Sequence, residues 1–241
     1  MRNKKLLLAF LAILALVSTS CNKLMARDNL NRGVRAFRES HYENAVNYFK
    51  EAIRLDPVLT MAEVYLGTAY LQMYIPGATS DENQKNAEMA IATFEKVLQR
   101  DPNNTSAIAG LASIHQNTGQ LQKAREYHLK NAQLNPTDPV PFYSVGSVNW
   151  IIVADKAAPP PPDEQIRLVD EGLQNLDKAL ALNPDYEDAM SYKNLLYREK
   201  ARLTENEQDK AQLIAMADEW FNKALETRKR LQEKKAAGLS Q

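Results

Sequence analysis

Cysteine and histidine, which often act as nucleophiles, general bases or metal ligands, are scarce in this 241-residue chain. Cys21 is the only cysteine, and the three histidines are His41, His115 and His128. A single thiol excludes an intramolecular disulfide, and no Cys/His spacing typical of a zinc site is present. The sequence also lacks a G-x-S-x-G elbow, an H-E-x-x-H pair, a P-loop and a dinucleotide-binding glycine fingerprint. We therefore expect a protein without catalytic residues, metal, cofactor or small-molecule substrate.

The charge of the chain gives no sign of a polyanionic partner. Lys plus Arg and Asp plus Glu number 30 each, so bulk charge does not indicate nucleic-acid binding. A basic cluster occurs near the C-terminus, in the segment ETRKRLQEKKAAG. Positive charge at the end of a helix is stabilised by the helix dipole. We therefore expect a solvated helix end there rather than a nucleic-acid or lipid patch.

The N-terminal 20 residues have the pattern of a secretory signal peptide. Arg2, Lys4 and Lys5 precede twelve uninterrupted apolar residues, from Leu6 to Val17. A helix needs roughly 20 residues to cross a hydrocarbon core of ~30 Å, so this run is too short to be a typical span. Small residues, Ser-Thr-Ser, follow it and end at the lone cysteine. The pattern predicts a cleaved leader over residues 1–20.

The small residues that end at Cys21 resemble the lipobox of bacterial lipoproteins, although Ser18 stands where that family favours leucine. The resemblance implies that Cys21 is lipidated, that residues 21–25 form a short linker, and that the protein is anchored in the cell envelope. Asn22 after the cysteine resembles the outer-membrane, periplasm-facing members of that family. Ordinary cleavage nearby and a retained membrane anchor are the alternatives.

The rest of the chain is organised by a repeat. Four helix-period segments close with Asp or Asn followed by proline, at Pro57, Pro102, Pro136 and Pro184. Asp and Asn tolerate the left-handed backbone that ends many helices, and proline cannot continue a helix, so each pair predicts a helix end. Small residues recur at fixed distances from these prolines, and a large residue recurs between them. The small set includes Gly33, Ala45, Gly67, Ala90, Ala124 and Gly146, and the large set Phe49, Phe94, His128 and Leu176.

This pattern resembles the tetratricopeptide repeat (TPR), a 34-residue helix-turn-helix unit. The segments YLGTAY and TGQLQKA are close to the family pattern, and Pro102 and Pro136 are 34 residues apart. The segment ADEWFNKAL, which contains Phe221, marks a fifth unit. The resemblance implies an all-α, right-handed superhelix of about five units over residues 26–236, with a tail at 237–241. The unit boundaries are predicted at 26–59, 60–104, 105–138, 139–186 and 187–230.

Three units are longer than the family period. The extra residues fall at 74–84, 154–166 and 204–214, each time between the first and second helix of a unit, so they should project from one edge of the array. Ser80 is a candidate helix N-cap, and Thr204 to Glu207 has the sequence of a capping box. The four prolines at 159–162 must interrupt the helix. We expect them to form a stiff spacer, a ligand for an aromatic-lined module being the alternative.

In the TPR family, partner peptides commonly lie on the concave surface made by the first helices. The register places six candidate groove residues there: Phe37, Val64, Leu71, Tyr143, Ser147 and Trp150. The lysines and asparagines with which chaperone-binding members clamp a terminal carboxylate are absent from the corresponding places. Tyr143 and Trp150 are the strongest anchor candidates, since aromatic residues dominate interface energies. Packing of Trp150 beneath the fourth-unit insertion is the alternative.

His115 and His128 hold two places that are usually aromatic in the family. We expect packing histidines rather than a two-histidine metal site, because no carboxylate or cysteine accompanies them in the pattern.

Together these features predict a non-catalytic scaffold that is lipid-anchored in the envelope and binds an envelope protein through its groove. The sequence looks like bacterial TPR lipoproteins that assist the assembly of secretins, pili or outer-membrane proteins. The alternative is an accessory subunit of an envelope peptidase or peptidoglycan hydrolase, with the active site on the partner.

Overall fold

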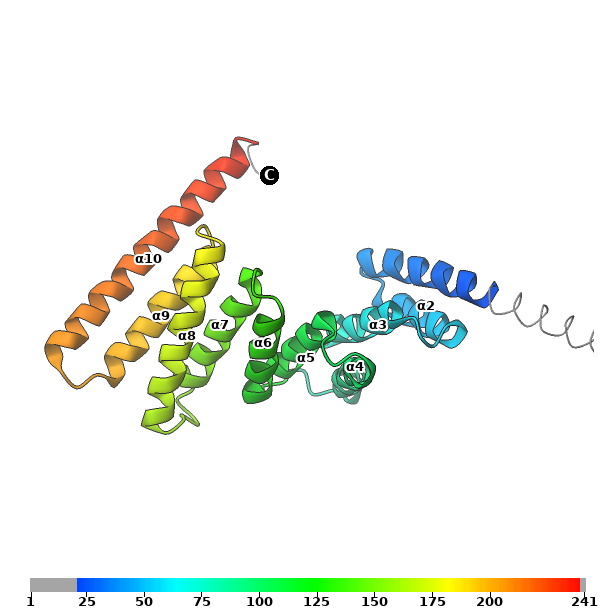
Figure 1. Ribbon diagram of the computed structural model, residues 1–241, viewed down its shortest axis with the longest axis horizontal. Helices are drawn as coiled ribbons and strands as arrows, with labels where there is room; N and C mark the ends of the chain where they lie inside the picture. The colour runs from blue at the N-terminus through cyan, green and yellow to red at the C-terminus, as the bar shows by residue number, and fades with distance from the viewer. Residues whose placement is uncertain (1–20, 239–241) are drawn as a thin grey trace, which may run out of the picture. The chain divides into compact units, whose positions relative to one another are not determined.

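The computed structural model describes residues 21–238, and all regular secondary structure in this range is α-helical (Figure 1). The predicted signal peptide and the last three residues of the chain lie outside the described residues. The chain divides after Thr118 into two compact units. Each unit consists of consecutive helices joined by short turns and packed against their neighbours in sequence, which is the helix array that the repeat predicts.

The first unit contains a helical segment from residue 21 to residue 38, followed by four helices. These are α2 (Tyr42–Leu55), α3 (Thr60–Met73), α4 (Asp81–Arg100) and α5 (Thr105–Asn117). Helix α3 contacts α2, α4 and α5. Residues 21–25, which we expected to be a linker, are helical and run directly into the first repeat. Cys21, Leu24 and Met25 are exposed on this helix, whereas Ala26 and Leu30 are buried.

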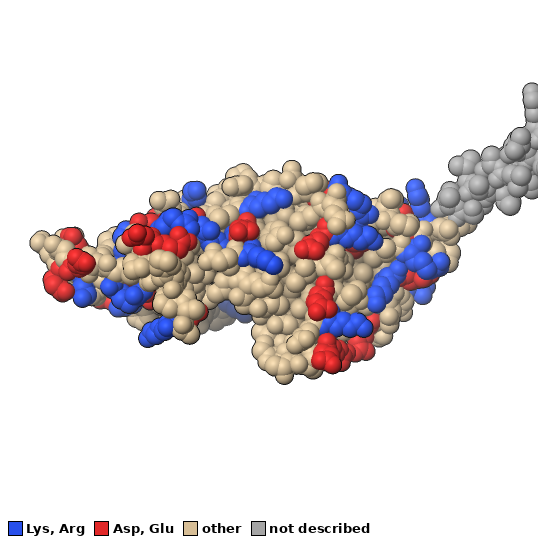
Figure 2. Space-filling model, turned by 90° about the horizontal axis from the view of Figure 1, so that it is seen from below, with Lys and Arg blue, Asp and Glu red and all other residues tan. Residues whose placement is uncertain are grey.

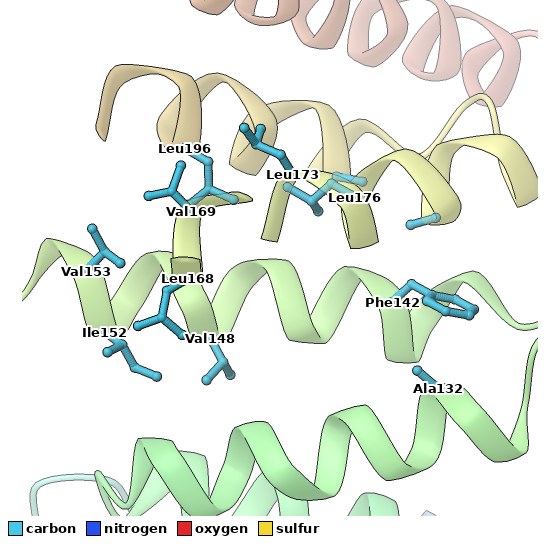
Figure 3. Packing of buried hydrophobic residues seen from close by; sticks show 12 residues of the cluster. Ala132, Phe142, Val148, Ile152, Val153, Leu168, Val169, Leu173, Leu176 and Leu196 are labelled. Atoms are coloured by element: carbon cyan, nitrogen blue, oxygen red, sulfur yellow. The ribbon is translucent and has the colours of Figure 1, made fainter. Parts of the chain in front are cut away.

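The second unit contains five helices. These are α6 (Leu121–Leu134), α7 (Pro139–Ala154), α8 (Pro162–Leu182), α9 (Glu187–Leu203) and α10 (Glu207–Ala236). Each helix packs on the next (Figure 1). Helix α7 also contacts α9, so the first helices of the last two repeats touch each other. The core of this unit is aliphatic. Figure 3 shows Leu168 of α8 near Ile152 and Val148 of α7, and Val169 of α8 beside Leu196 of α9.

The small and large residues of the repeat meet as predicted. A methyl group added to Gly33 would overlap the ring of Phe49, and one added to Gly146 would overlap Leu176. Phe94 lies against two glycines, Gly67 and Gly110, one on α3 and one on α5. Bare glycine backbone thus lets a large side chain plug the gap at each helix crossing.

The Asp-Pro and Asn-Pro pairs do end the helices, but not through the left-handed backbone that we expected. Asp56, Asp101, Asn135 and Asn183 have φ angles of −139°, −132°, −123° and −135°. Proline disfavours helical backbone in the residue before it and pushes that residue toward the extended region. The Asx side chain then helps the turn: the Asn183 side-chain oxygen accepts a hydrogen bond from the Asp185 N–H (3.1 Å).

The extra length of the repeats is partly helix. Helix α4 has 20 residues against 14 in α2, and Ser80 caps it by accepting a hydrogen bond from the Asn83 N–H (3.2 Å). Residues 155–161 form a non-helical segment, and α8 begins at the last of the four prolines. The predicted capping box is wrong, because Asn206, not Thr204, caps α10. The Thr204 hydroxyl instead donates to the Lys200 carbonyl (2.8 Å) and helps to close α9.

Candidate functional site

The six predicted groove residues fall into two sets, one in each unit. In the first unit Phe37, Val64 and Leu71 are half-buried, and the Phe37 ring contacts the rings of Tyr42 and Tyr65 at centroid distances of 5.3 and 6.4 Å. These rings form a small aromatic surface at the start of the array.

The other three candidates, Tyr143, Ser147 and Trp150, lie on α7 and differ in their exposure. Tyr143 and Trp150 are each partly buried. Ser147 is buried, with 5% of its surface exposed, and its hydroxyl donates to the Ser144 carbonyl (3.0 Å). Its hydroxyl is therefore not available to a ligand.

Tyr143 and Trp150 join two tyrosines of the next repeat to form one cluster. The Tyr143 ring lies 4.9 Å from that of Tyr186 and 5.6 Å from that of Tyr192, and Trp150 lies 5.6 Å from Tyr192. All four side chains are partly exposed. We call Tyr143, Trp150, Tyr186 and Tyr192 the aromatic face. It is built across α7 and α9, the first helices of two consecutive repeats, which is where the family resemblance places a groove.

Buried polar contacts fix the rotation of α7. The Asn149 amide, completely buried, donates to the Leu168 carbonyl and to the Glu171 carboxylate, both at 2.9 Å. Arg125 of α6 binds the same carboxylate through two nitrogens. Because Asn149 is held toward α8, its neighbour Trp150 is directed to another side of the helix, where it meets Tyr192.

A second set of contacts fixes α9. Lys193 is 5% exposed, forms an ion pair with Asp177 of α8, and its nitrogen lies 3.8 Å from the centroid of the Trp220 ring on α10. A cation over an indole face is attracted by the ring quadrupole. These contacts hold Lys193 between α8 and α10, and so direct its neighbour Tyr192 toward α7.

The aromatic face has an acidic edge. Burial, then the neighbouring Tyr192, Asp188 and Tyr186, raises the pKa of Tyr143 well above its usual value. Burial, Asp188 and Asp138 likewise raise the pKa of Tyr186. Both aspartates are exposed. Exposed rings beside carboxylates suit an apolar segment that also carries a basic side chain.

A hollow in the first unit has no comparable chemistry. It has a volume of about 560 Å³ and lies beside the 74–80 insertion, between the start of α2 and the start of α4. Its lining mixes Tyr42 and Met73 with Glu43, Glu82 and Asn86. The Asn83 side chain fastens the insertion through hydrogen bonds with the backbone of Ile75 and Ala78, at 2.7 to 2.9 Å.

The two histidines predicted to pack are both buried, His115 at 4% and His128 at 6% exposed. Burial lowers the pKa of His128 to about 4, so its imidazole is neutral at physiological pH. Within residues 21–238, no three His, Cys, Asp or Glu side chains converge so that they could hold a metal ion.

Two further properties concern the surface. On the face drawn in Figure 2, basic and acidic side chains are interspersed over the described residues. None of the helices within residues 21–238 combines the length and apolar content that crossing a bilayer requires.

Sequence reasoning missed two members of the aromatic face, Tyr186 and Tyr192. Tyr192 stands two residues before Asn194, as Tyr65 stands two residues before Gly67. Tyr65 stacks on Phe49 (5.5 Å). The shared position of Tyr192 and Tyr65 in the repeat could therefore have indicated that Tyr192 contacts a neighbouring aromatic ring. Tyr186 directly precedes α9 and has no counterpart in the repeat pattern.

Comparisons with known proteins agree with this architecture. Tetratricopeptide repeat models match residues 33–58 and residues 83–138. Among solved structures, MamA (residues 41 to end) from Desulfovibrio magneticus RS-1 is similar, with a TM-score of 0.65 and 18% identity over 86% of this chain and 96% of that one. YrrB, described as a TPR protein with an unusual peptide-binding site, gives a TM-score of 0.57 and 19% identity over 83% of this chain and 90% of its own.

A search of curated proteins finds no match. The structural likenesses lie below 25% identity and therefore establish the fold alone. Residues 33–58 and 83–138 are thus tetratricopeptide repeats, and the protein has the fold of a tetratricopeptide-repeat helix array.

Proposed function

We propose that the protein is a non-catalytic interaction scaffold whose aromatic face binds a segment of another protein. The observation that carries the proposal is the cluster of four half-exposed rings across α7 and α9. Aromatic side chains are enriched among the residues that contribute most to binding energy. YrrB, a protein of similar fold, is described as having a peptide-binding site, which supports a peptide-binding role for a helix array of this kind.

The chemistry of the face suggests the kind of segment that it binds. Apolar side chains would pack on the exposed rings, and a lysine or arginine would lie close to Asp138 and Asp188, whose charges act on the tyrosines. We therefore expect an extended apolar segment with at least one basic residue. Neutral tyrosine hydroxyls can donate hydrogen bonds to its backbone.

We further propose that a lipid on Cys21 tethers the scaffold in the cell envelope, facing the periplasm at the outer membrane. The support is the leader pattern of residues 1–20, the small residues before the cysteine, and the exposure of Cys21. Two or more acyl chains are needed for stable anchoring. The partner is then an envelope protein of the secretion, pilus or outer-membrane assembly type.

The binding proposal is tested by screening a peptide library against the purified full-length protein and its variants. Trp150→Ala and Tyr143→Ala should each weaken binding of the selected peptides at least tenfold. The control is Tyr48→Ala, which replaces a half-buried tyrosine on α2 and should leave binding unchanged. Selected peptides should be apolar with a basic residue. Peptides that bind both variants as tightly as the parent would contradict the proposal.

The anchor and the partner are tested in cells. Replacing Cys21 by alanine should abolish incorporation of a labelled fatty acid, and an unchanged mass and membrane retention would reject lipidation. Cross-linking followed by mass spectrometry should then recover an assembly or secretion component that is lost in Trp150→Ala. Recovery of a peptidase or peptidoglycan hydrolase would favour an accessory-subunit role instead.

A further inference from the structure

The last helix presents a row of apolar side chains to solvent. Ile214, Phe221 and Leu225 of α10 are 39%, 46% and 45% exposed. Their spacing of seven and four residues places them on one side of the helix. The side that packs on α9 is different and carries the buried Ala217 and Ala224. We call Ile214, Phe221 and Leu225 the α10 stripe.

The repeat itself shows what normally covers such a row. Phe49, Phe94 and Leu176 hold the place of Phe221 in earlier repeats, and all three are completely buried. Phe94 is enclosed by a glycine from the first helix of its own repeat and by Gly110 from the first helix of the next. Phe221 has α9 as its own first helix, and no helix follows α10 within residues 21–238. The half of Phe221 that a following helix would cover is therefore open.

The charges around the stripe indicate the polarity of the missing helix. Helix α9 lies against α10 with acidic residues at its start paired to basic residues near the end of α10: Glu187 with Arg228, and Asp185 with Arg230. Lys229 lies one turn after Leu225, beside the stripe, and no acidic partner for it occurs within residues 21–238. A second helix antiparallel to α10 would bring its own first turn to Lys229. An acidic first turn would suit both this lysine and its own helix dipole.

We propose that the α10 stripe docks an amphipathic α-helix of a partner protein, acidic in its first turn and with glycine or alanine facing Phe221. A second copy of α10 does not meet this description. Its stripe presents three large apolar side chains and no small residue, so two stripes could not interlock as Phe94 does with Gly110. This surface lies on α10 and goes beyond the binding proposed for the aromatic face of α7 and α9.

A synthetic helix copied from this chain provides the probe. The peptide spans residues 101–118, which include α5 and Gly110, with Thr105→Glu and Ser106→Asp to make the first turn acidic. It carries fluorescein, and fluorescence anisotropy follows its titration with the full-length protein. We expect saturable binding. The same peptide with Gly110→Trp should bind at least tenfold more weakly.

Variants of the protein assign the binding to the stripe. Phe221→Asp should weaken binding of the probe at least tenfold, and Lys229→Glu should weaken it about threefold or more. A probe in which lysines replace the two acidic residues should bind Lys229→Glu with restored affinity. The matched control is Met216→Asp, since Met216 is 40% exposed on the same helix but off the stripe. The control should bind like the parent, and so should Tyr143→Ala and Trp150→Ala, which separates this test from that of the aromatic face.

Three results would overturn the proposal: no saturable binding of the probe, equal binding by Phe221→Asp and the parent, or loss of binding in Met216→Asp to the same extent. Sedimentation velocity adds a fourth. If the parent self-associates and Phe221→Asp is monomeric, the occupant of the stripe is a second copy of the chain and not a foreign helix.

Discussion

The ring of Phe94 occupies the space in which a side chain at Gly110 would lie, so that α4 and α5 interlock across the boundary between two repeats. On its other side the same ring meets Gly67 of α3, and Phe94 is completely buried. One aromatic residue thus joins three helices, and its fit depends on the absence of a methyl group at two positions.

Replacing Gly110 by alanine should leave the stability of the protein unchanged or lower it. Helix propensity alone predicts a gain of about 1 kcal/mol, but overlap with the Phe94 ring should cost roughly 1–3 kcal/mol. The free energy of unfolding from urea titration should therefore fall or stay level rather than rise. Phe94→Leu in the same chain should reduce the penalty, and the exposed Ser106→Ala on α5 serves as the control. A clear gain in stability would contradict this packing.

Glu63 should contribute to the stability of the first unit through its ion pairs. The residue is 1% exposed, and its carboxylate pairs with Lys96 (3.1 Å) and with Arg100, both on α4. Glu63→Gln removes the charge but keeps the shape, so we expect a loss of about 1–3 kcal/mol in the free energy of unfolding. Glu88→Gln, at an exposed place on α4, should change it little. Equal changes in the free energy of unfolding for Glu63→Gln and Glu88→Gln would argue against stabilising ion pairs of Glu63.

His128 should make the protein acid-sensitive. Burial lowers its pKa to about 4, whereas the unfolded chain takes up the proton near 6.5, so stability is lost as the pH falls through this interval. The full effect is about 3 kcal/mol. His128→Phe, which restores the residue found at positions 49 and 94, should flatten the dependence of the urea midpoint between pH 7 and pH 4. His41→Gln is the exposed control.

Tyr143 should make the protein alkali-sensitive. Its pKa is raised in the folded state, so above pH ~10 the unfolded chain loses the phenolic proton first and stability declines as the pH rises. Tyr143→Phe should make this decline shallower when urea unfolding is compared at pH 8, 10 and 11.5. Superimposable pH profiles for parent and variant would show that Tyr143 is not held protonated by its surroundings.

The helix array was predictable because its packing rests on a local rule. Small residues at Gly33, Gly67 and Gly146 and large residues at Phe49 and Phe94 recur at fixed intervals, and the structure brings them together. Helix ends were predictable in position but not in conformation. Asp and Asn tolerate the left-handed region, but the proline that follows Asp56 and its equivalents disfavours helical backbone at the preceding residue. These residues are therefore extended.

The candidate site was only partly predictable. Tyr143 and Trp150 follow from the register, but Ser147 at an equivalent place is buried because α7 packs against α6, α8 and α9 together, and nine of its 16 residues are buried. Tyr186 joins the aromatic face from outside the repeat pattern. The exposure of Phe221 depends on what lies beside α10, which no residue of the repeat itself encodes.

Of the two tryptophans of the chain, one belongs to the aromatic face and the other lies against α9. Trp150 belongs to the aromatic face, and Trp220 precedes Phe221 with the ammonium groups of Lys193 and Lys223 at 3.8 and 4.4 Å from its ring. The two indoles therefore sense different electric fields, and their emission maxima should differ. With Trp220 replaced by phenylalanine, the remaining Trp150 becomes a built-in optical reporter, so that occupancy of the aromatic face can be followed without a label.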